Sequence, residues 1–116
     1  MKKRHIVLFI DTSSHERISV AVEEDGKKFE STSSSKTANA QNVLPLIEKL
    51  LKARGLKLSD ITEIRVNCGP GSFTGARVGV AVANMIGSLL SVPINGKKVG
   101  ETVLPVYTPS KLDSDQ

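Results

Sequence analysis

The sequence predicts a single α/β domain, built on a mixed β-sheet with two main helices. Three observations lead to this class: short apolar segments near the start of the chain, a change to helical periodicity from Asn39 onward, and a later β-branched segment. A strand, a helix and a second strand in that order form a crossover, so the later strand is expected to lie parallel to an earlier one. A chain of 116 residues is long enough for one such domain.

The first three elements are predicted to form an antiparallel meander. Residues 6–10 are apolar throughout, as in a central strand that is covered on both faces, and residues 18–22 alternate well enough to return beside it. The Asp-Gly pair at residues 25–26 is typical of a tight hairpin loop. Residues 28–33 follow this loop and are expected to form a third, more exposed strand.

From Asn39 the apolar residues recur with the period of a helix. Gly55 is expected to end this helix, and residues 64–68 are expected to form the fourth strand. Pro45 lies about one turn in, so either the helix begins within residues 40–42 and tolerates proline in its first turn, or it is kinked there. The apolar face consists of Val43, Leu44, Ile47, Leu50 and Leu51.

A glycine-rich loop leaves the fourth strand and opens into the second helix. Within residues 68–77 (Cys-Gly-Pro-Gly-Ser-Phe-Thr-Gly-Ala-Arg), Gly69 and Gly71 allow a positive φ or a close backbone approach, and Ser72 is placed to cap the helix. Free backbone N–H groups at such a junction favour an anion. The spacing matches neither a Walker A loop nor the Rossmann fingerprint. A phosphate site and a simple tight turn therefore both stay open.

The second helix, predicted over residues 72–89, carries a small residue at every fourth position. Each glycine costs a helix up to about 1 kcal/mol relative to alanine, so we expect the close approach of another backbone to offset the cost. That backbone belongs either to the chain's own sheet or first helix, or to a second chain. The apolar remaining faces of the helix favour a second chain. The small residues are Gly75, Gly79, Ala83 and Gly87.

Composition limits the classes of function. The net charge of +4 permits contact with RNA or an acidic partner without requiring it, and an aromatic content of 3% argues against a base-stacking platform. The single Cys68 suits a reducing compartment. The apolar runs are too short for a signal peptide or a membrane span. We therefore expect a cytoplasmic protein that does not enter a membrane.

Two motifs, together with the order of the elements, resemble the TsaB (YeaZ) family. The first is Ile-Asp-Thr-Ser at residues 10–13, and the second is Gly-Pro-Gly-Ser-Phe-Thr-Gly-Ala-Arg-Val-Gly at residues 69–79. The resemblance extends over residues 6–96 and includes Val-Leu-Pro-Leu-Ile at residues 43–47. It implies a ribonuclease-H-like fold of the actin and sugar-kinase superfamily.

The chain departs from the family pattern in two places. Residues 1–98 correspond to the N-terminal domain of the family, and residues 99–116 are expected to form a closing segment and a flexible tail. Because residues 104–109 are similar to the segment with which longer members close, this arrangement indicates internal loss of the second domain. The first helix also begins with Asn-Ala-Gln at residues 39–41, where members often carry His-Ser-Glu, so a function of that His or Glu is not carried over.

The resemblance implies a role in forming N6-threonylcarbamoyladenosine in tRNAs that read codons beginning with A. In the family, the protein is a non-catalytic scaffold and activating subunit that pairs with its paralogue TsaD, the threonylcarbamoyl transferase, and the ATPase TsaE joins the complex. Contact with tRNA is expected to be indirect or weak. We predict no catalytic residue, metal or cofactor. The predicted partner interface consists of Val43, Ile47, Phe73, Gly75, Arg77, Val78, Gly79, Val82, Ala83, Ile86 and Gly87.

Two alternatives stay open beside this prediction. One is a small nucleotide-binding or phosphotransfer protein whose site closes on dimerisation, with Asp11, Thr12, Gly71 and Ser72 as contacts to phosphate, nucleotide or metal. Asp11 stands where superfamily kinases place a metal-binding Asp, but its loop lacks the glycine that lets phosphate approach. We favour a role for Asp11 in capping the turn through Thr12 and Ser13. The other alternative is a homodimeric structural protein.

Overall fold

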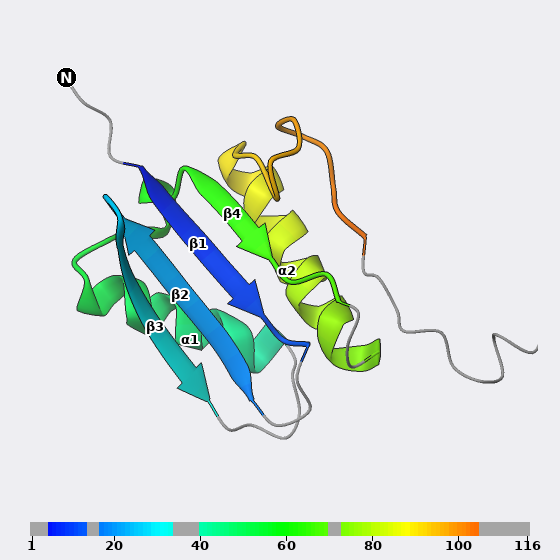
Figure 1. The fold of residues 1–116 in the computed structure, drawn as a ribbon, viewed down its shortest axis with the longest axis horizontal. Coiled ribbons are helices and arrows are strands. Elements are labelled where there is room, and N and C mark those ends of the chain that lie inside the picture. Colours follow the sequence, from blue (N-terminus) through cyan, green and yellow to red (C-terminus); the bar gives the residue numbers. More distant parts are fainter. Residues whose placement is uncertain (1–4, 14–16, 34–39, 70–72, 105–116) are drawn as a thin grey trace, which may run out of the picture.

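Four strands form one mixed sheet in the order β3-β2-β1-β4 (Figure 1). The computed structural model describes residues 5–13, 17–33, 40–69 and 73–104. The first strand, β1 (Ile6–Asp11), pairs antiparallel with β2 (Ile18–Glu24), which pairs antiparallel with β3 (Lys27–Ser33). On its other side β1 pairs in parallel with β4 (Glu63–Val66). The predicted meander and the predicted parallel crossover are both confirmed.

The loop between β2 and β3 has the conformation that its Asp-Gly pair predicts. Asp25 and Gly26 have φ values of 51° and 87°. Two successive residues with positive φ turn the chain with the twist of the flanking strands, and Asp and Gly are residues that tolerate this conformation. The hairpin therefore fixes the register in which Glu24 lies opposite Lys27.

Two helices cover one side of the sheet (Figure 1). Helix α1 (Ala40–Ala53) packs on β2 and β3, helix α2 (Phe73–Leu90) packs on β4 and β1, and the two helices touch each other. Helix α1 starts within the predicted range and continues through Pro45, and Gly55 follows its end with a φ of 70°. A short 3-10 helix, η1 (Leu58–Asp60), lies in the connection to β4.

The core lies between the helices and the strand residues that point toward them. Alternate residues of β1, which are Ile6, Leu8 and Ile10, are fully buried on this side. Val7 and Phe9 point to the opposite side, where Val7 is buried and Phe9 is half-buried, so the expectation that the first strand is covered on both faces holds at Val7 but not at Phe9. The core also contains Ile18, Val20, Val22, Val43, Ile47, Leu50, Leu51, Leu56, Ile61, Ile64, Val66, Val80, Val82, Ala83, Ile86, Ile94 and Val103.

The outer edge of β4 is paired by a segment that the sequence did not reveal. The backbone of Ile64 accepts a hydrogen bond from the Asn95 amide and donates one to the Pro93 carbonyl, at 2.8 and 3.0 Å. The Asn95 side chain then acts like one more peptide group, because its Oδ1 accepts from the Val66 amide and its Nδ2 donates to the Val66 carbonyl, at 2.8 and 3.1 Å. This edge is thereby protected from pairing with other chains.

A second asparagine holds the closing segment on α2. The Nδ2 of Asn84 donates to the carbonyl of Val103, and the amide of Val103 donates to the Asn84 Oδ1, both at 2.9 Å. Val103 is 3% exposed and belongs to the core. The start of the predicted closing segment therefore packs on the domain, and the rest of it, from residue 105 onward, lies outside the described residues.

Candidate functional site

The predicted Asp11 lies in a polar cluster at the carboxyl ends of β1 and β4. These parallel strands end side by side, because Ile10 pairs with Val66, and they bring Asp11 next to Asn67. The Asp11 carboxylate accepts hydrogen bonds from the Ser13 amide at 3.0 Å, from the Ser13 hydroxyl at 2.6 Å and from the Asn67 side chain at 3.2 Å. Asn67 also accepts from the Gly69 amide at 2.9 Å, so the cluster fixes the start of the glycine-rich loop.

The electrostatics of this cluster keep Asp11 ionised. Burial raises the pKa of the Asp11 carboxyl, but the hydrogen bonds from the Ser13 hydroxyl, the Ser13 amide and Asn67 outweigh it and hold the pKa below its ordinary value. Donors arranged in this way stabilise the charged form of a carboxyl group. The interaction of Asp11 with the residue two positions later is the turn-capping geometry that the sequence favoured.

A residue that contacts phosphate has to be accessible from solvent, and Thr12 is not. Its side chain is completely buried, and its hydroxyl accepts a hydrogen bond from the Gly79 amide at 2.9 Å. A Cβ at position 79 would come within 2.5 Å of the Thr12 Oγ1, so only glycine lets α2 approach β1 this closely. The other two predicted contacts, Gly71 and Ser72, lie outside the described residues.

Three members of the small-residue stripe of α2, which are Gly79, Ala83 and Gly87, pack inside the chain. A Cβ at position 87 would meet the Ile94 side chain at 2.5 Å, and Ala83 is fully buried in the core. The space next to Gly79 and Gly87 is therefore filled by the chain's own residues, through the Thr12 and Ile94 side chains and not through the predicted backbone. The predicted partner interface stays a prediction, and in the single chain seven of its residues are buried: Val43, Ile47, Gly79, Val82, Ala83, Ile86 and Gly87.

A different part of α2 faces solvent. Met85 and Leu89 are 49% and 71% exposed, and Ala81 one turn earlier is also exposed. Their spacing of four residues places them on one line along the helix. Of the predicted interface residues, Arg77 is exposed and Val78 is half-buried, whereas the side chains of Phe73 and Gly75 are outside the described residues. We call Arg77, Ala81, Met85, Ser88 and Leu89 the α2 outer surface.

The sequence contained a signal for this surface. Helix α2 is apolar on nearly every side, and one face of such a helix suffices to cover the sheet. The glycines, however, lie on the face of the helix that is buried. The exposed face is the one that carries the flexible side chains of Met85 and Leu89. In the described residues, neither helix is both long and apolar enough to span a membrane.

Comparison with known proteins identifies the family. A family model described as "TsaD: tRNA N6-adenosine threonylcarbamoyltransferase" matches residues 31–97. The tRNA threonylcarbamoyladenosine biosynthesis protein TsaB of Escherichia coli is 33% identical over 90 residues, which are 78% of this chain and 38% of that protein. The TsaB of Bacillus subtilis is 31% identical over 97 residues, which are 84% of this chain and 42% of that protein.

A solved structure leads to the same family. YeaZ from Pseudomonas aeruginosa has a TM-score of 0.74 and 31% sequence identity, over 81% of this chain and 44% of that one. The chain thus spans less than half of the length of these relatives. The chain belongs to the TsaB (YeaZ) family and has an actin-like α/β fold.

Proposed function

We propose that this chain acts in the biosynthesis of N6-threonylcarbamoyladenosine in tRNA, as a non-catalytic subunit that pairs with TsaD in the cytoplasm. The names of its relatives support the pathway. The observation that carries the partnership is the α2 outer surface. Two large apolar side chains, Met85 and Leu89, lie exposed on one line of a helix whose other faces are already packed.

This surface has the features of a helix-docking site. Large apolar side chains on successive turns can pack into the grooves of a second helix, and Met adapts its shape to different partners. Ala81 leaves room for close approach at one end of the line, and Arg77 supplies a charge at its margin. A partner with an apolar helical surface, such as a paralogue of the same fold, fits this arrangement.

A non-catalytic role is supported by the polar groups at the end of β1, which are already engaged in contacts within the chain. The hydroxyl of Thr12 is buried against Gly79, and the carboxylate of Asp11 is held by Ser13 and Asn67. These groups therefore hold the strand ends and α2 together. In this proposal, TsaE joins the complex through TsaD, and tRNA is contacted mainly by the partner.

The proposal is tested with the double variant Met85→Glu/Leu89→Glu. Placing two carboxylates in the centre of an apolar interface is expected to weaken copurification with TsaD of the same organism by more than about tenfold, because each charge would lose its water on binding. The matched control is Val99→Glu/Leu104→Glu, since Val99 and Leu104 are 55% and 78% exposed but lie outside α2. The control is expected to bind like the unchanged chain.

A tRNA threonylcarbamoylation assay completes the test. Activity of TsaD with TsaE is expected to depend on this chain and to be lost with the α2 double variant but not with its control. Full activity without the chain, or equal binding of both double variants, would overturn the proposal. Thermal stabilisation by ATP that is abolished by Asp11→Ala would instead support the nucleotide-binding alternative.

A further inference from the structure

A tight turn ends the segment that pairs with the outer edge of β4. We call residues 93–95 of this segment the edge strip. Asn95 and Gly96 have φ values of 53° and 76°, and the Lys97 amide donates to the Ile94 carbonyl at 3.0 Å. Two successive residues with positive φ, closed by such a hydrogen bond, form the turn that favours an Asn-Gly pair. No other asparagine in the sequence is followed by glycine.

An asparagine that precedes glycine reacts with its own backbone. The glycine amide loses its proton to hydroxide, and its nitrogen attacks the side-chain carbon Cγ of the asparagine. A new C–N bond closes a succinimide ring, while the bond from Cγ to the side-chain nitrogen breaks and ammonia leaves. Water then opens the ring at either carbonyl and yields aspartate or isoaspartate. In total, the chain takes up water and releases ammonia.

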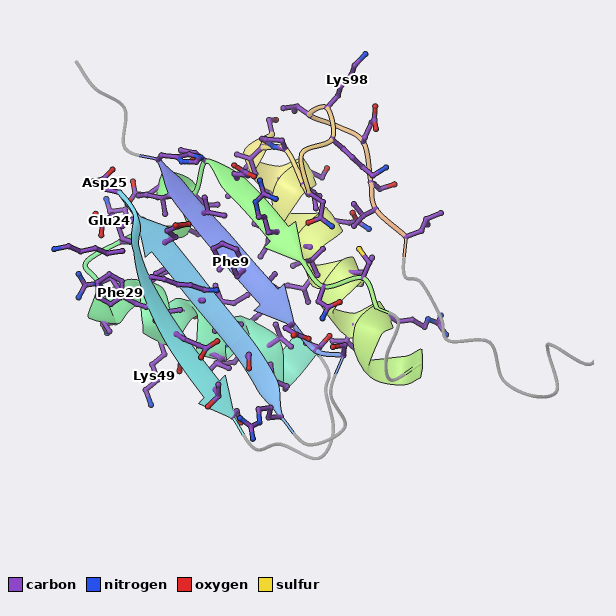
Figure 2. The ribbon with its side chains drawn as sticks, viewed as in Figure 1. Phe9, Glu24, Asp25, Phe29, Lys49 and Lys98 are labelled. Carbon is purple, nitrogen blue, oxygen red and sulfur yellow. The ribbon has the colours of Figure 1, made fainter. Side chains whose placement is uncertain are left out.

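The nucleophile of this reaction is accessible in the folded chain. Gly96 is exposed, and a Cβ built on it would meet nothing within 4 Å. Its amide makes no hydrogen bond to another described residue. Lys97 and Lys98 follow, and Figure 2 shows the exposed Lys98 side chain pointing away from the molecule. Positive charges close to the amide favour the anion that forms when its proton leaves.

The electrophile is the Asn95 side chain, and the fold holds it in place. Its Oδ1 accepts from the Val66 amide at 2.8 Å, and its Nδ2 donates to the Val66 carbonyl at 3.1 Å and lies 3.4 Å from the Cys68 Sγ. The attack requires rotation of this side chain and of the peptide that joins it to Gly96. The contacts with Val66 must therefore break before the ring can close.

The edge strip is placed where such an opening is least costly. It is held to β4 by the two backbone hydrogen bonds of Ile64 and by the Asn95 side chain, and residues 96–102 beyond it are all exposed. Segments at the margin of a sheet open at a lower free energy than the core. When opening and closing are fast, the rate of a reaction in the open form follows the population of that form.

Asn84 provides a comparison within the same chain. Its side chain makes the same pair of hydrogen bonds, to the amide and the carbonyl of Val103, both at 2.9 Å. It lies inside α2, however, and is followed by Met85. The helical backbone holds the peptide that would have to rotate, and the Met85 side chain crowds the nitrogen that would attack. The two asparagines share their contacts and differ in the residue that follows.

We propose that Asn95 is a site of spontaneous deamidation, which takes place when the edge strip opens and weakens the strip once it has occurred. This inference concerns the single chain, so it does not depend on the proposed pairing with TsaD. Because no step restores the amide, the change is permanent. A chain whose edge strip has opened often is therefore marked by a new carboxylate at position 95.

Both products disturb the contact with β4. In aspartate, an oxygen replaces the Nδ2 that donates to the Val66 carbonyl, so two acceptors face each other. In isoaspartate, the main chain is longer by one carbon, which displaces Gly96 and disrupts the turn between Ile94 and Lys97. The outer edge of β4 is then less well protected from pairing with other chains.

Mass spectrometry of the folded chain after incubation tests the reaction. Trypsin cleaves after Arg77 and Lys97, so one peptide, residues 78–97, carries both Asn84 and Asn95. Digestion at mildly acidic pH keeps the reaction from continuing in the peptide. We expect an acid at position 95 and not at position 84, and both aspartate and isoaspartate, as ring opening requires. The chain unfolded in urea should react about tenfold faster or more, because nothing holds its side chain.

Two matched variants test the dependence on opening. Ile94 and Val103 are each 3% exposed and lie at the two ends of the exposed loop. Ile94→Ala loosens the edge strip and should accelerate the reaction by about tenfold or more, whereas Val103→Ala loosens the other end and should change it by less than about threefold. Circular dichroism checks that both variants fold.

Hydrogen exchange tests the effect of the product. Asn95→Asp carries one of the two products from the start, and the Ile64 amide, which donates to Pro93, should exchange about fivefold faster or more in it. Asn84→Asp is the matched control and should leave the exchange of the Ile64 amide unaltered.

Several results would overturn the inference. These are equal conversion of Asn84 and Asn95, formation of aspartate without isoaspartate, equal effects of the two alanine variants, and unchanged exchange of Ile64 in Asn95→Asp. Absence of acid at position 95 would overturn it too, if the folded chain is kept about a hundred times as long as the unfolded chain needs to react.

Discussion

The two sides of the sheet are built from neighbouring residues of the same strands, yet they differ in nearly every property. On the side of the helices, β1 contributes Leu8 and Ile10, which are fully buried. On the side turned away from the helices, which we call the open face, it contributes the buried Val7, Phe9, which is half-buried under a lysine, and Asp11 in a polar cluster. One side forms the core of the fold, and the other is polar at its end and leaves the Phe9 ring partly in water. The difference teaches that an unbroken apolar strand does not prove that both of its faces are covered.

The largest expected effect is on stability, and it differs between neighbouring residues of β1 that lie on opposite sides of the sheet. Leu8→Ala should lower the free energy of unfolding by about 2 to 5 kcal/mol, because it leaves a cavity in a closed core. Phe9→Ala removes a larger side chain but should cost only about 1 to 2 kcal/mol, since the ring is already partly in water. Urea unfolding at low micromolar protein measures both. Equal costs would mean that the open face is covered in the single chain.

An intermediate effect is expected where β1 meets α2. Gly79→Ala should cost about 1 to 3 kcal/mol, because the new methyl group would collide with the hydroxyl of Thr12. In a chain that already carries Thr12→Ala, the same change should cost clearly less. Thermal melting of the four chains of this cycle measures the coupling. Independent, additive costs would show that the collision is relieved by a shift of the helix.

The smallest expected effect concerns pH at the margin of the open face. The pKa of Asp11 is lowered in the folded chain, so its stabilising contribution is present above the ordinary value of about 4 and is lost as the pH falls through the folded value. Ser13→Ala removes a hydrogen bond to the carboxylate and should raise the pKa of Asp11 toward its ordinary value. Stability should then decrease less steeply in acid.

An NMR titration of the Asp11 carboxyl carbon measures this change directly. Ser88→Ala, at an exposed position on α2, is the control and should leave the titration unaltered. An unchanged pKa in Ser13→Ala would show that the Ser13 amide and Asn67 suffice to hold the charge.

Much of the fold could be predicted because its signals are local. The Asp-Gly pair fixes a hairpin, the helical spacing in residues 43–51 fixes α1, and the crossover fixes the parallel pairing of β4. The edge contact of Asn95 could not be predicted in this way. It joins residues 29 positions apart through one side-chain amide, and neither periodicity nor turn chemistry marks such a contact.

The site was harder to predict than the fold. The spacing of Gly79 and Gly87 correctly indicated close packing against the helix, but the groups that approach most closely are side chains and not the predicted backbone. These side chains belong to Thr12 and Ile94, which only the folded chain brings to these positions. Surface exposure, on which Met85 and Leu89 depend, is likewise a result of packing and not of local pattern.

The two asparagine contacts also determine where the molecule can be lengthened. Asn95 fastens one end of residues 96–102 to the sheet and Asn84 fastens the other end to α2, while the residues between them are exposed. The entropy of closing a loop grows only slowly with its length, so even a long insertion between these anchors would cost the domain little. Gly100, with a φ of 94° and open space around it, is a natural point at which to graft a peptide tag.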